Sequence, residues 1–294
     1  CDEDSLTMAF EASFLALDGF KEKDKIKVVF FGSETPPYAV NPSSTILAEF
    51  LGIEKNYLGR DHQIACKATT GAMISALGLI SSGFTEYALI VASDKGVAKT
   101  HDPLEYTVGA GAVSLLLGGK DVLLEVVDFT SFSSDTPDFW RREGIRYPSH
   151  GGRFTGKPSY FYHIKEASLN LLKKSKLNPP NFKFAIFHMP NGKFPLEIGL
   201  SLGFTKEQLL PGLIVSFLGN CYTASALMGL LAVLEKAKVG DLIFLASYGS
   251  GAGSDAFVFR VTKNINTARR NFNLKLKDKQ YIDYPTYLKF MGTI

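Results

Sequence analysis

The sequence predicts an α/β protein in which one β-α-β-ββ unit occurs twice. Short runs of Val, Ile, Leu and Phe are typical of strands buried on both faces, and apolar helices rich in Ala and Gly follow them. Three pairs of landmarks share one spacing of 154 residues, namely Glu34 and His188, Cys66 and Asn220, and Asp94 and Tyr248. Because one offset at three positions indicates an internal repeat, we expect two similar halves related by a two-fold pseudo-symmetry.

The elements of the first half follow from periodicity and cap residues. In chain order they are a helix over 2–20, a buried strand over 26–32, a short helix over 45–51, a helix over 67–82, a buried strand over 87–94, and a pair of strands over 109–118 and 122–127. Acidic residues and an Asp or Ser cap mark the start of the first helix, since such side chains satisfy its unpaired N–H groups. Glu34 follows the first strand at its carboxyl end, where open α/β sheets bind ligands.

The second half repeats this order. It is expected to contain a strand over 184–190, a helix that opens at 219–225 and runs to Lys236, a strand over 241–248, and a glycine-rich turn over 249–254 that leads into a strand over 256–261. The segment 129–163, between the halves, is rich in Gly, Pro, aromatic residues and Arg. Because a long segment without regular structure is usually functional, one interpretation is a loop that covers the site. The other is a solvated basic face.

Composition limits the classes of function. The chain of 294 residues, 46% of them hydrophobic, is long enough for one large domain or two fused ones. A net charge of +3 suits small anionic substrates but is too weak to indicate nucleic acid. Because no apolar run could span a bilayer and no signal-peptide pattern opens the chain, we expect a cytoplasmic protein that binds no membrane. The three cysteines cannot all pair and do not cluster with histidines, so we expect neither a disulfide framework nor a metal site.

Cys66 is the candidate nucleophile. It stands where the helix over 67–82 begins, and the unpaired N–H groups and partial positive charge of a helix start favour a thiolate. The alternative is a small, buried, apolar side chain, which is a common role of cysteine. The repeat favours the first interpretation, because two-fold symmetry would bring Cys66 together with Asn220, Glu34 and His188.

These four residues allow acyl transfer with carbon–carbon bond formation. A cysteine thiolate accepts an acyl group from a thioester, and a nearby histidine polarises a carbonyl oxygen or transfers a proton. An asparagine donates a hydrogen bond to developing negative charge. A glutamate in the same apolar pocket has a raised pKa, which suits a base that removes and returns a proton. Taken singly, Glu34 would be an exposed loop carboxylate and His188 a strand-end histidine bonded to backbone.

At these residues the sequence resembles the thiolase superfamily and, within it, the hydroxymethylglutaryl-CoA synthases of archaeal type. The matching stretches cover nearly the whole chain in order, and they are 32–40, 65–68, 135–144, 151–156, 187–195 and 249–257. The resemblance implies a thiolase-like fold whose duplicated halves form α-β-α-β-α layers. It divides the chain into an N-terminal half over 1–128, an active-site covering insertion over 129–165, a C-terminal half over 166–262 and a C-terminal extension over 263–294.

The resemblance implies one condensation, a step of the mevalonate pathway. Acetyl-CoA would acetylate Cys66, and Glu34 would then take a proton from the acetyl methyl group. His188 would hold and polarise the ketone of acetoacetyl-CoA, which the carbanion attacks, and water would release 3-hydroxy-3-methylglutaryl-CoA from the cysteine. The coenzyme A thioesters are substrates, and no further cofactor is implied.

The resemblance extends to the substrate-binding residues and to partners. The positions that match substrate-lining residues of the family are Asn220, Ser250, Thr107 and Thr155, and Lys193 matches one that meets coenzyme A. The family also implies a homodimer and, in archaeal members, a complex with acetoacetyl-CoA thiolase bridged by a small OB-fold protein.

Two departures from the family pattern lead to further expectations. Family chains begin several dozen residues earlier, with a strand and helix expected to pair with the region 26–31. We therefore expect the chain that begins at Cys1 to be incomplete and to lack a strand central to its first sheet. Glu197 stands where family members often carry an arginine that helps bind coenzyme A, and a carboxylate there would repel phosphate.

Other functions remain open at this point. A β-ketoacyl synthase also uses Cys, His and Asn, but its decarboxylating condensation needs no carboxylate base such as Glu34. A thiolase would need a second cysteine in the last glycine-rich loop, and 247–251 contains none. A catalytically weak subunit, kept for its interfaces within a thiolase and synthase complex, would form no acetyl adduct on Cys66.

Overall fold

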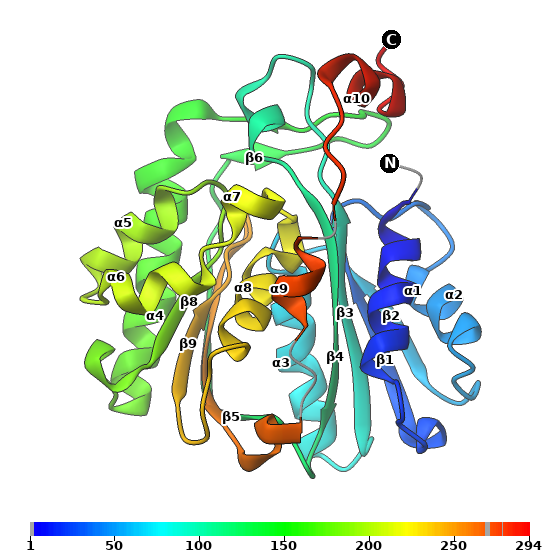
Figure 1. Cartoon of the computed structure of the whole chain (residues 1–294), viewed down its shortest axis with the longest axis vertical. Coiled ribbons are helices and arrows are strands. Elements are labelled where there is room, and N and C mark those ends of the chain that lie inside the picture. Colours follow the sequence, from blue (N-terminus) through cyan, green and yellow to red (C-terminus); the bar gives the residue numbers. More distant parts are fainter. Residues whose placement is uncertain (1–2, 268–270, 278) are drawn as a thin grey trace.

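The computed structural model describes residues 3–267, 271–277 and 279–294 (Figure 1). The first half consists of α1 (Ser5–Ala16), β1 (Ile26–Gly32), α2 (Ser43–Phe50), β2 (Leu58–His62), α3 (Ala68–Ser81), β3 (Tyr87–Lys95) and β4 (Ala110–Gly118). Then follow β5 (Leu124–Ser133), β6 (Phe139–Trp140), β7 (Ser149–His150), α4 (Tyr162–Ser175), β8 (Phe184–Phe187), α5 (Phe194–Ser201), α6 (Lys206–Leu209), α7 (Val215–Leu218), α8 (Ser225–Leu234), β9 (Leu242–Ala246), β10 (Gly253–Val261), α9 (Phe272–Lys275) and α10 (Tyr284–Phe290).

Two four-stranded sheets form the framework of the fold. The first has the order β2-β1-β3-β4, with β1 parallel to both neighbours and β4 antiparallel to β3. The second has the order β5-β10-β9-β8, with β8 and β9 parallel and β10 antiparallel to both neighbours. In Figure 1, α3 and α8 lie between the sheets, while α1 and α2 cover one outer face and α4 to α6 the other. The α-β-α-β-α layering predicted for the chain is therefore confirmed.

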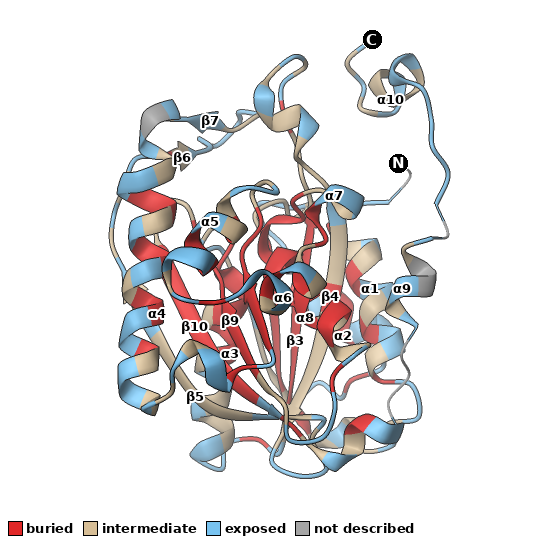
Figure 2. Cartoon of the chain, turned by 60° about the vertical axis from the view of Figure 1, so that its left-hand side comes forward, coloured by how far each residue is buried: buried red, intermediate tan, exposed pale blue. Residues whose placement is uncertain are grey.

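Alternation along the strands divides the core between the layers. In β1, Val28 and Phe30 belong to the central cluster around α3 and α8, whereas Val29 and Phe31 pack under α1 and α2. A third cluster lies between α4 and the other face of the second sheet. Figure 2 shows this burial concentrated in strands and in the central helices. Among the described residues, no helix combines the length and apolar character needed to cross a membrane.

The pseudo-symmetry is visible at the centre of the molecule. Thr69 in α3 and Thr223 before α8 are 154 positions apart, and their hydroxyl groups hydrogen-bond to each other. At Gly32, the end of β1, a Cβ atom would lie 2.3 Å from the Thr69 hydroxyl oxygen. Thr69, near the start of α3, therefore packs against the end of β1 and bonds to Thr223, its equivalent in the second half. This contact supports the repeat inferred from the sequence.

Two expectations about strand pairing are wrong. The segments 109–118 and 122–127 do not pair, because β4 joins β3 in the first sheet and β5 crosses to β10 in the second. Local patterning identifies strands, but it does not fix their partners. The boundary expected at residue 128, like the start of the insertion at 129, consequently falls within a strand of the second sheet.

The second error concerns the expected gap in the first sheet. β1 hydrogen-bonds to β2 on one side and to β3 on the other, so the centre of that sheet is continuous among the described residues. The strand that β5 contributes beside β10 has no described counterpart beside β4, which places the difference between the sheets at an edge. Cys1, the residue on which this expectation was based, lies outside the described residues.

A backbone contact between the halves leads to a stability prediction. A Cβ atom on Gly109 would lie 1.9 Å from the Leu218 carbonyl oxygen, whereas one on Gly119 would meet nothing within 4 Å. Because backbone must move to make room, we expect Gly109→Ala to lower the free energy of unfolding by about 3 kcal/mol. The control Gly119→Ala should change it by less than about 0.5 kcal/mol. Denaturant titration measures both, and equal effects would contradict the contact.

Candidate active site

Asp94, near the carboxyl end of β3, holds two parts of the candidate site. Its Oδ1 accepts hydrogen bonds from the loop after β1, from Ser33 Oγ at 2.9 Å, Glu34 N–H at 2.7 Å, Thr35 N–H at 2.9 Å and Thr35 Oγ1 at 2.7 Å. Its Oδ2 accepts one from the Thr223 N–H at 3.0 Å. One buried carboxylate therefore joins the loop that carries Glu34 to the segment that precedes α8.

Cys66 and Asn220 are presented by equivalent turns. Ala65, which precedes Cys66, has φ +46°, and Gly219, which precedes Asn220, has φ +72°. Left-handed backbone costs an L-residue about 1–2 kcal/mol, a cost that glycine avoids. α3 begins at Ala68, two residues after the cysteine. The two turns bring both residues into the interior, with Cys66 7% and Asn220 9% exposed.

The Glu34 carboxyl group lies against the Cys66 thiol, and the two side chains hydrogen-bond to each other. The second oxygen, Oε1, is buried and has no hydrogen-bond partner among the described residues. Burial, followed by the negative charge of Asp94, raises the pKa of Glu34 to about 8, and the Cys66 hydrogen bond and the charge of Arg141 act in the opposite direction. The raised pKa predicted for a glutamate in this pocket is confirmed.

The predicted shift of Cys66 toward thiolate is wrong for the structure without substrate. Burial, followed by the charge and hydrogen bond of Glu34, raises the pKa of the thiol well above its ordinary value. A helix start contributes only about 0.3–1 kcal/mol, and removing a thiolate from water costs more. The thiol is therefore protonated at rest, with the carboxyl group of Glu34 as its immediate proton-accepting neighbour.

His188 follows β8 and is 2% exposed. Its backbone N–H donates to the Ala246 carbonyl at 2.8 Å, and its carbonyl accepts from Tyr160 Oη at 2.6 Å. Burial lowers the pKa of the imidazole to about 3, so the ring is neutral near pH 7. Nδ1 has no hydrogen-bond partner among the described residues. A neutral imidazole can donate an N–H hydrogen bond to a carbonyl oxygen without giving up its proton.

A backbone ladder between the halves brings Thr107 and Asn220 together. The Asn220 N–H donates to the Thr107 carbonyl at 2.6 Å, and the Gly109 N–H donates to the Asn220 carbonyl at 2.9 Å. The side-chain Oδ1 of Asn220 accepts from the Tyr222 N–H at 3.0 Å, so its own chain orients the amide. The Thr107 hydroxyl donates to the Leu104 carbonyl at 3.1 Å, within its own turn.

A pocket of about 200 Å³ opens beside Glu34. Its lining consists of Glu34, Thr35, Gln63, Ala65, Val97, Phe139, Trp140, Arg141, Pro148, Tyr222 and Ser250. The insertion between the halves supplies part of this wall through the hairpin β6–β7, which favours the interpretation as a covering segment over that of a solvated face. Ser250 also hydrogen-bonds to Tyr248, whose ring centroid lies 6.1 Å from that of His188.

Of the predicted site residues, Glu34 and Ser250 line this pocket, whereas Cys66, His188, Asn220 and Thr107 lie outside its lining. Thr155 is partly exposed, and its N–H donates to the Gly152 carbonyl at 3.2 Å. Lys193 is exposed just before α5, and Glu197 is exposed in the first turn of the same helix. None of the three lines the pocket described above.

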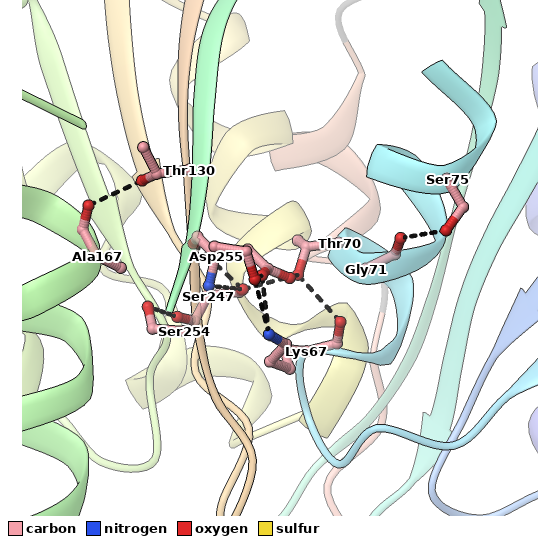
Figure 3. A network of polar contacts seen from close by, with 10 residues as sticks. Lys67, Thr70, Gly71, Ser75, Thr130, Ala167, Ser247, Ser254 and Asp255 are labelled. Atoms are coloured by element: carbon pink, nitrogen blue, oxygen red, sulfur yellow. Dashed lines mark hydrogen bonds and ion pairs between the residues drawn. The ribbon is translucent and has the colours of Figure 1, made fainter. Parts of the chain in front are cut away.

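A buried ion pair lies beside the nucleophile. Lys67, 4% exposed, donates from Nζ to Asp255 Oδ1 at 2.9 Å, and Asp255 is fully buried in β10. The other carboxylate oxygen accepts from Thr70 Oγ1 at 2.7 Å, and Thr70 meets Ser247 Oγ at 2.7 Å (Figure 3). Ser131 Oγ completes the set, at 2.6 Å from Asp255 Oδ1. The start of α3 is thereby fixed to β5, to β10 and to the residue that follows β9.

Sequence reasoning missed most of this support. Asp94 served only as a repeat landmark, and Lys67 and Asp255 received no role. A usable signal was present, since a single charged residue within an otherwise apolar strand or helix start requires a buried partner. Tyr248 was likewise only a landmark, yet its hydroxyl donates to the buried Asp138 at 2.6 Å.

No family model matches the chain. A protein of Methanococcoides burtonii, called hydroxymethylglutaryl-CoA synthase, is 46% identical over 300 residues, which cover 100% of this chain and 86% of the relative. One of the same name from Aeropyrum pernix is 45% identical over 298 residues, which cover 100% of this chain and 82% of the relative.

Solved structures agree with these relatives. An HMG-CoA synthase complexed with CoA superposes with a TM-score of 0.88 at 27% identity, covering 97% of this chain and 77% of the other. A second structure, MvaS in complex with 3-hydroxy-3-methylglutaryl coenzyme A, superposes with a TM-score of 0.87 at 22% identity, covering 98% and 80%. The second similarity concerns the fold alone.

The buried ion pair leads to a second stability prediction. Lys67→Met leaves Asp255 charged, buried and without its cation, so we expect a loss of about 3–5 kcal/mol in the free energy of unfolding. In Lys67→Met/Asp255→Leu no buried charge is left without a partner, and this double variant should be more stable than either single variant. Thermal or denaturant unfolding measures the series. Additive losses in the double variant would show that the two side chains are not coupled.

Proposed function

The chain belongs to the hydroxymethylglutaryl-CoA synthase family, and on that premise we propose that it condenses acetyl-CoA with acetoacetyl-CoA to 3-hydroxy-3-methylglutaryl-CoA through acetyl-Cys66. The contact between the Glu34 carboxyl group and the Cys66 thiol carries this proposal. A base beside the acetylated cysteine is what removal of a methyl proton requires. The same contact disfavours a β-ketoacyl synthase, whose carbanion arises by decarboxylation.

In the first step Cys66 attacks the thioester carbonyl of acetyl-CoA. The bond from sulfur to the acetyl carbon forms, the bond to coenzyme A breaks, and coenzyme A leaves as its thiol after taking up one proton. Because the Cys66 thiol is protonated at rest, its proton must be removed, and the ionised form of Glu34 is placed to accept it. Glu34 then passes this proton to the departing coenzyme A sulfur, so that it is a carboxylate again before the second step.

In the second step Glu34 removes a proton from the acetyl methyl group. The resulting carbanion attacks the ketone carbon of acetoacetyl-CoA, and the ketone oxygen becomes the product hydroxyl by gaining a proton. His188 would donate a hydrogen bond to that oxygen as negative charge develops. The proton that the oxygen gains is the one that Glu34 removed from the methyl group. Water then hydrolyses the bond to Cys66 and restores the thiol.

Binding roles follow the same assignment. We assign Asn220, Ser250, Thr107 and Thr155 to the substrate and Lys193 to coenzyme A. The role of Ser250 is supported by its place in the pocket lining. The roles of Asn220 and Thr107 are supported by the backbone hydrogen bond that joins them. Because Lys193 and Thr155 do not line the pocket, their roles require the longer reach of a coenzyme A chain across the surface.

The proposal includes the setting of the reaction. The two coenzyme A thioesters are the substrates, and no resident cofactor or metal is invoked. We propose that the chain acts in the mevalonate pathway, in the cytoplasm, as a homodimer that associates with acetoacetyl-CoA thiolase through a small OB-fold protein.

The acetyl intermediate provides the direct test. Intact-mass measurement after mixing with acetyl-CoA should show one acetyl group in the wild type and none in Cys66→Ala. Glu34→Gln should still accumulate the adduct on prolonged mixing, while product formation from acetoacetyl-CoA falls by roughly 10²–10⁴-fold. Cys221→Ala is the matched control and should be acetylated like the wild type. An absent adduct on folded wild-type protein would favour the weak subunit instead.

The negative charge of Asp94 leads to a prediction about pH. Because Glu34 acts as a carboxylate and its pKa is about 8, the condensation rate should rise with pH through that value. Asp94→Asn removes a charge that raises the Glu34 pKa. In a plot of condensation rate against pH, the rising limb should therefore move to lower pH by about one unit. The pH profile of product formation from preformed acetyl-enzyme measures the shift. A limb that stays in place would exclude electrostatic coupling between the two carboxyl groups.

A further inference from the structure

The hairpin β6–β7 forms one wall of the pocket. Its two strands pair Phe139 with His150 and Trp140 with Ser149. Phe139, Trp140, Arg141 and Pro148 of this hairpin line the pocket together with Glu34 and Thr35 of the loop after β1. The hairpin therefore delivers side chains from the insertion to the edge of the proposed reaction site.

Arg141 connects the hairpin to that loop. Its Nη2 donates to the Glu34 carbonyl oxygen at 3.0 Å, and its Nη1 donates to the Ile145 carbonyl at 3.4 Å. One planar guanidinium group thus contacts both the turn of the hairpin and the backbone of the proposed base. Lysine, with a single ammonium group, would keep the charge but not this double contact.

The charges around Glu34 have opposite signs. The groups that act on its carboxyl group are Asp94 from β3, Cys66 from the turn before α3 and Arg141 from the hairpin. The Tyr222 hydroxyl also lies within electrostatic range. Arg141 is the only one among these groups, all within the described residues, that carries a positive charge. It counteracts the effect of burial and of Asp94 on the base.

The hairpin has other anchors besides Arg141. His150 Nε2 lies 3.4 Å from Asp102 Oδ2, and the Gly151 N–H donates to the Asp138 carbonyl at 2.7 Å. The ring of Phe139 meets that of Tyr222 at a centroid distance of 6.3 Å. A change at Arg141 alone therefore leaves three contacts that hold the hairpin in place.

We propose that Arg141 is a positioning residue for Glu34, through which the docked hairpin brings a fixed positive charge to the carboxylate that removes the methyl proton. The cation favours the charged, proton-accepting form of the base, and the bond to the Glu34 carbonyl fixes the loop. Arg141 therefore both lines the covered pocket and favours the proton-accepting form of Glu34. This inference rests on the proposed function.

The test uses Arg141→Gln, Arg141→Lys and, as a matched control, Arg142→Gln, which changes a neighbouring arginine that is exposed like Arg141. Each variant is first loaded with acetyl-CoA, and the rate of condensation from acetyl-enzyme is then followed against pH. Without the cation the Glu34 pKa rises, so the rising limb in Arg141→Gln should move up by about half to one pH unit. The rate near pH 7 should fall by about 3- to 10-fold.

Arg141→Lys should keep the limb near its wild-type position while losing rate, and Arg142→Gln should leave both unchanged. A merely structural role would lower the rate of Arg141→Gln without moving the limb, and that result would overturn the proposal. A shift in Arg141→Lys as large as that in Arg141→Gln would also overturn it.

A second readout separates this proposal from the proposed function. Infrared titration of the Glu34 carboxyl band, assigned by its loss in Glu34→Gln, reports the pKa without any turnover. The band should titrate at higher pH in Arg141→Gln than in the wild type. Failure of acetyl loading with this shift present would reject the synthase assignment alone, whereas an unchanged band would reject the role of Arg141.

Discussion

The arrangement of the site depends on a single buried carboxylate. Asp94 accepts four hydrogen bonds from the loop after β1 through one oxygen, and its second oxygen accepts from the backbone that precedes α8. A buried charge is tolerated only when donors surround it, and here the donors come from both halves. The same carboxylate that positions Glu34 also makes that residue harder to ionise. Position and proton affinity of the proposed base are therefore set by one group.

The segment that carries the nucleophile is held by a different kind of contact, a buried ion pair. Lys67 and Asp255 neutralise each other next to Cys66, so the start of α3 gains rigidity without exposing the thiol to a lone cation. Cys66 lies at a helix start but is not a thiolate, because burial and the neighbouring Glu34 carboxyl group outweigh the helix dipole. Reactivity then requires a base within reach, and the loop after β1 supplies one at Glu34.

The sequence was sufficient to predict the strands, the helices and the meeting of Glu34 with Cys66, because apolar runs are local signals and one spacing recurs at three positions, while the layering was implied by the family resemblance. It did not predict that β5 leaves β4 for β10, since strand partners depend on contacts between distant segments. The shift of the Cys66 pKa was missed for a related reason, because desolvation depends on the complete surroundings of the sulfur. The role of Arg141 depends on how the insertion docks, which no periodicity encodes. Thr155 and Lys193 stay predictions that rest on the family pattern.

The contact between Lys67 and Asp255 has a consequence for how the chain matures. The two residues are 188 positions apart, and the β5–β10 pair that carries Asp255 also joins distant segments. Such long-range pairings form late, because the intervening loop must close before any contact stabilises it. During synthesis from the N-terminus, the segment around Cys66 therefore leaves the ribosome long before its counter-ion does. The nucleophile acquires its final surroundings only when the last strand of the second sheet has joined.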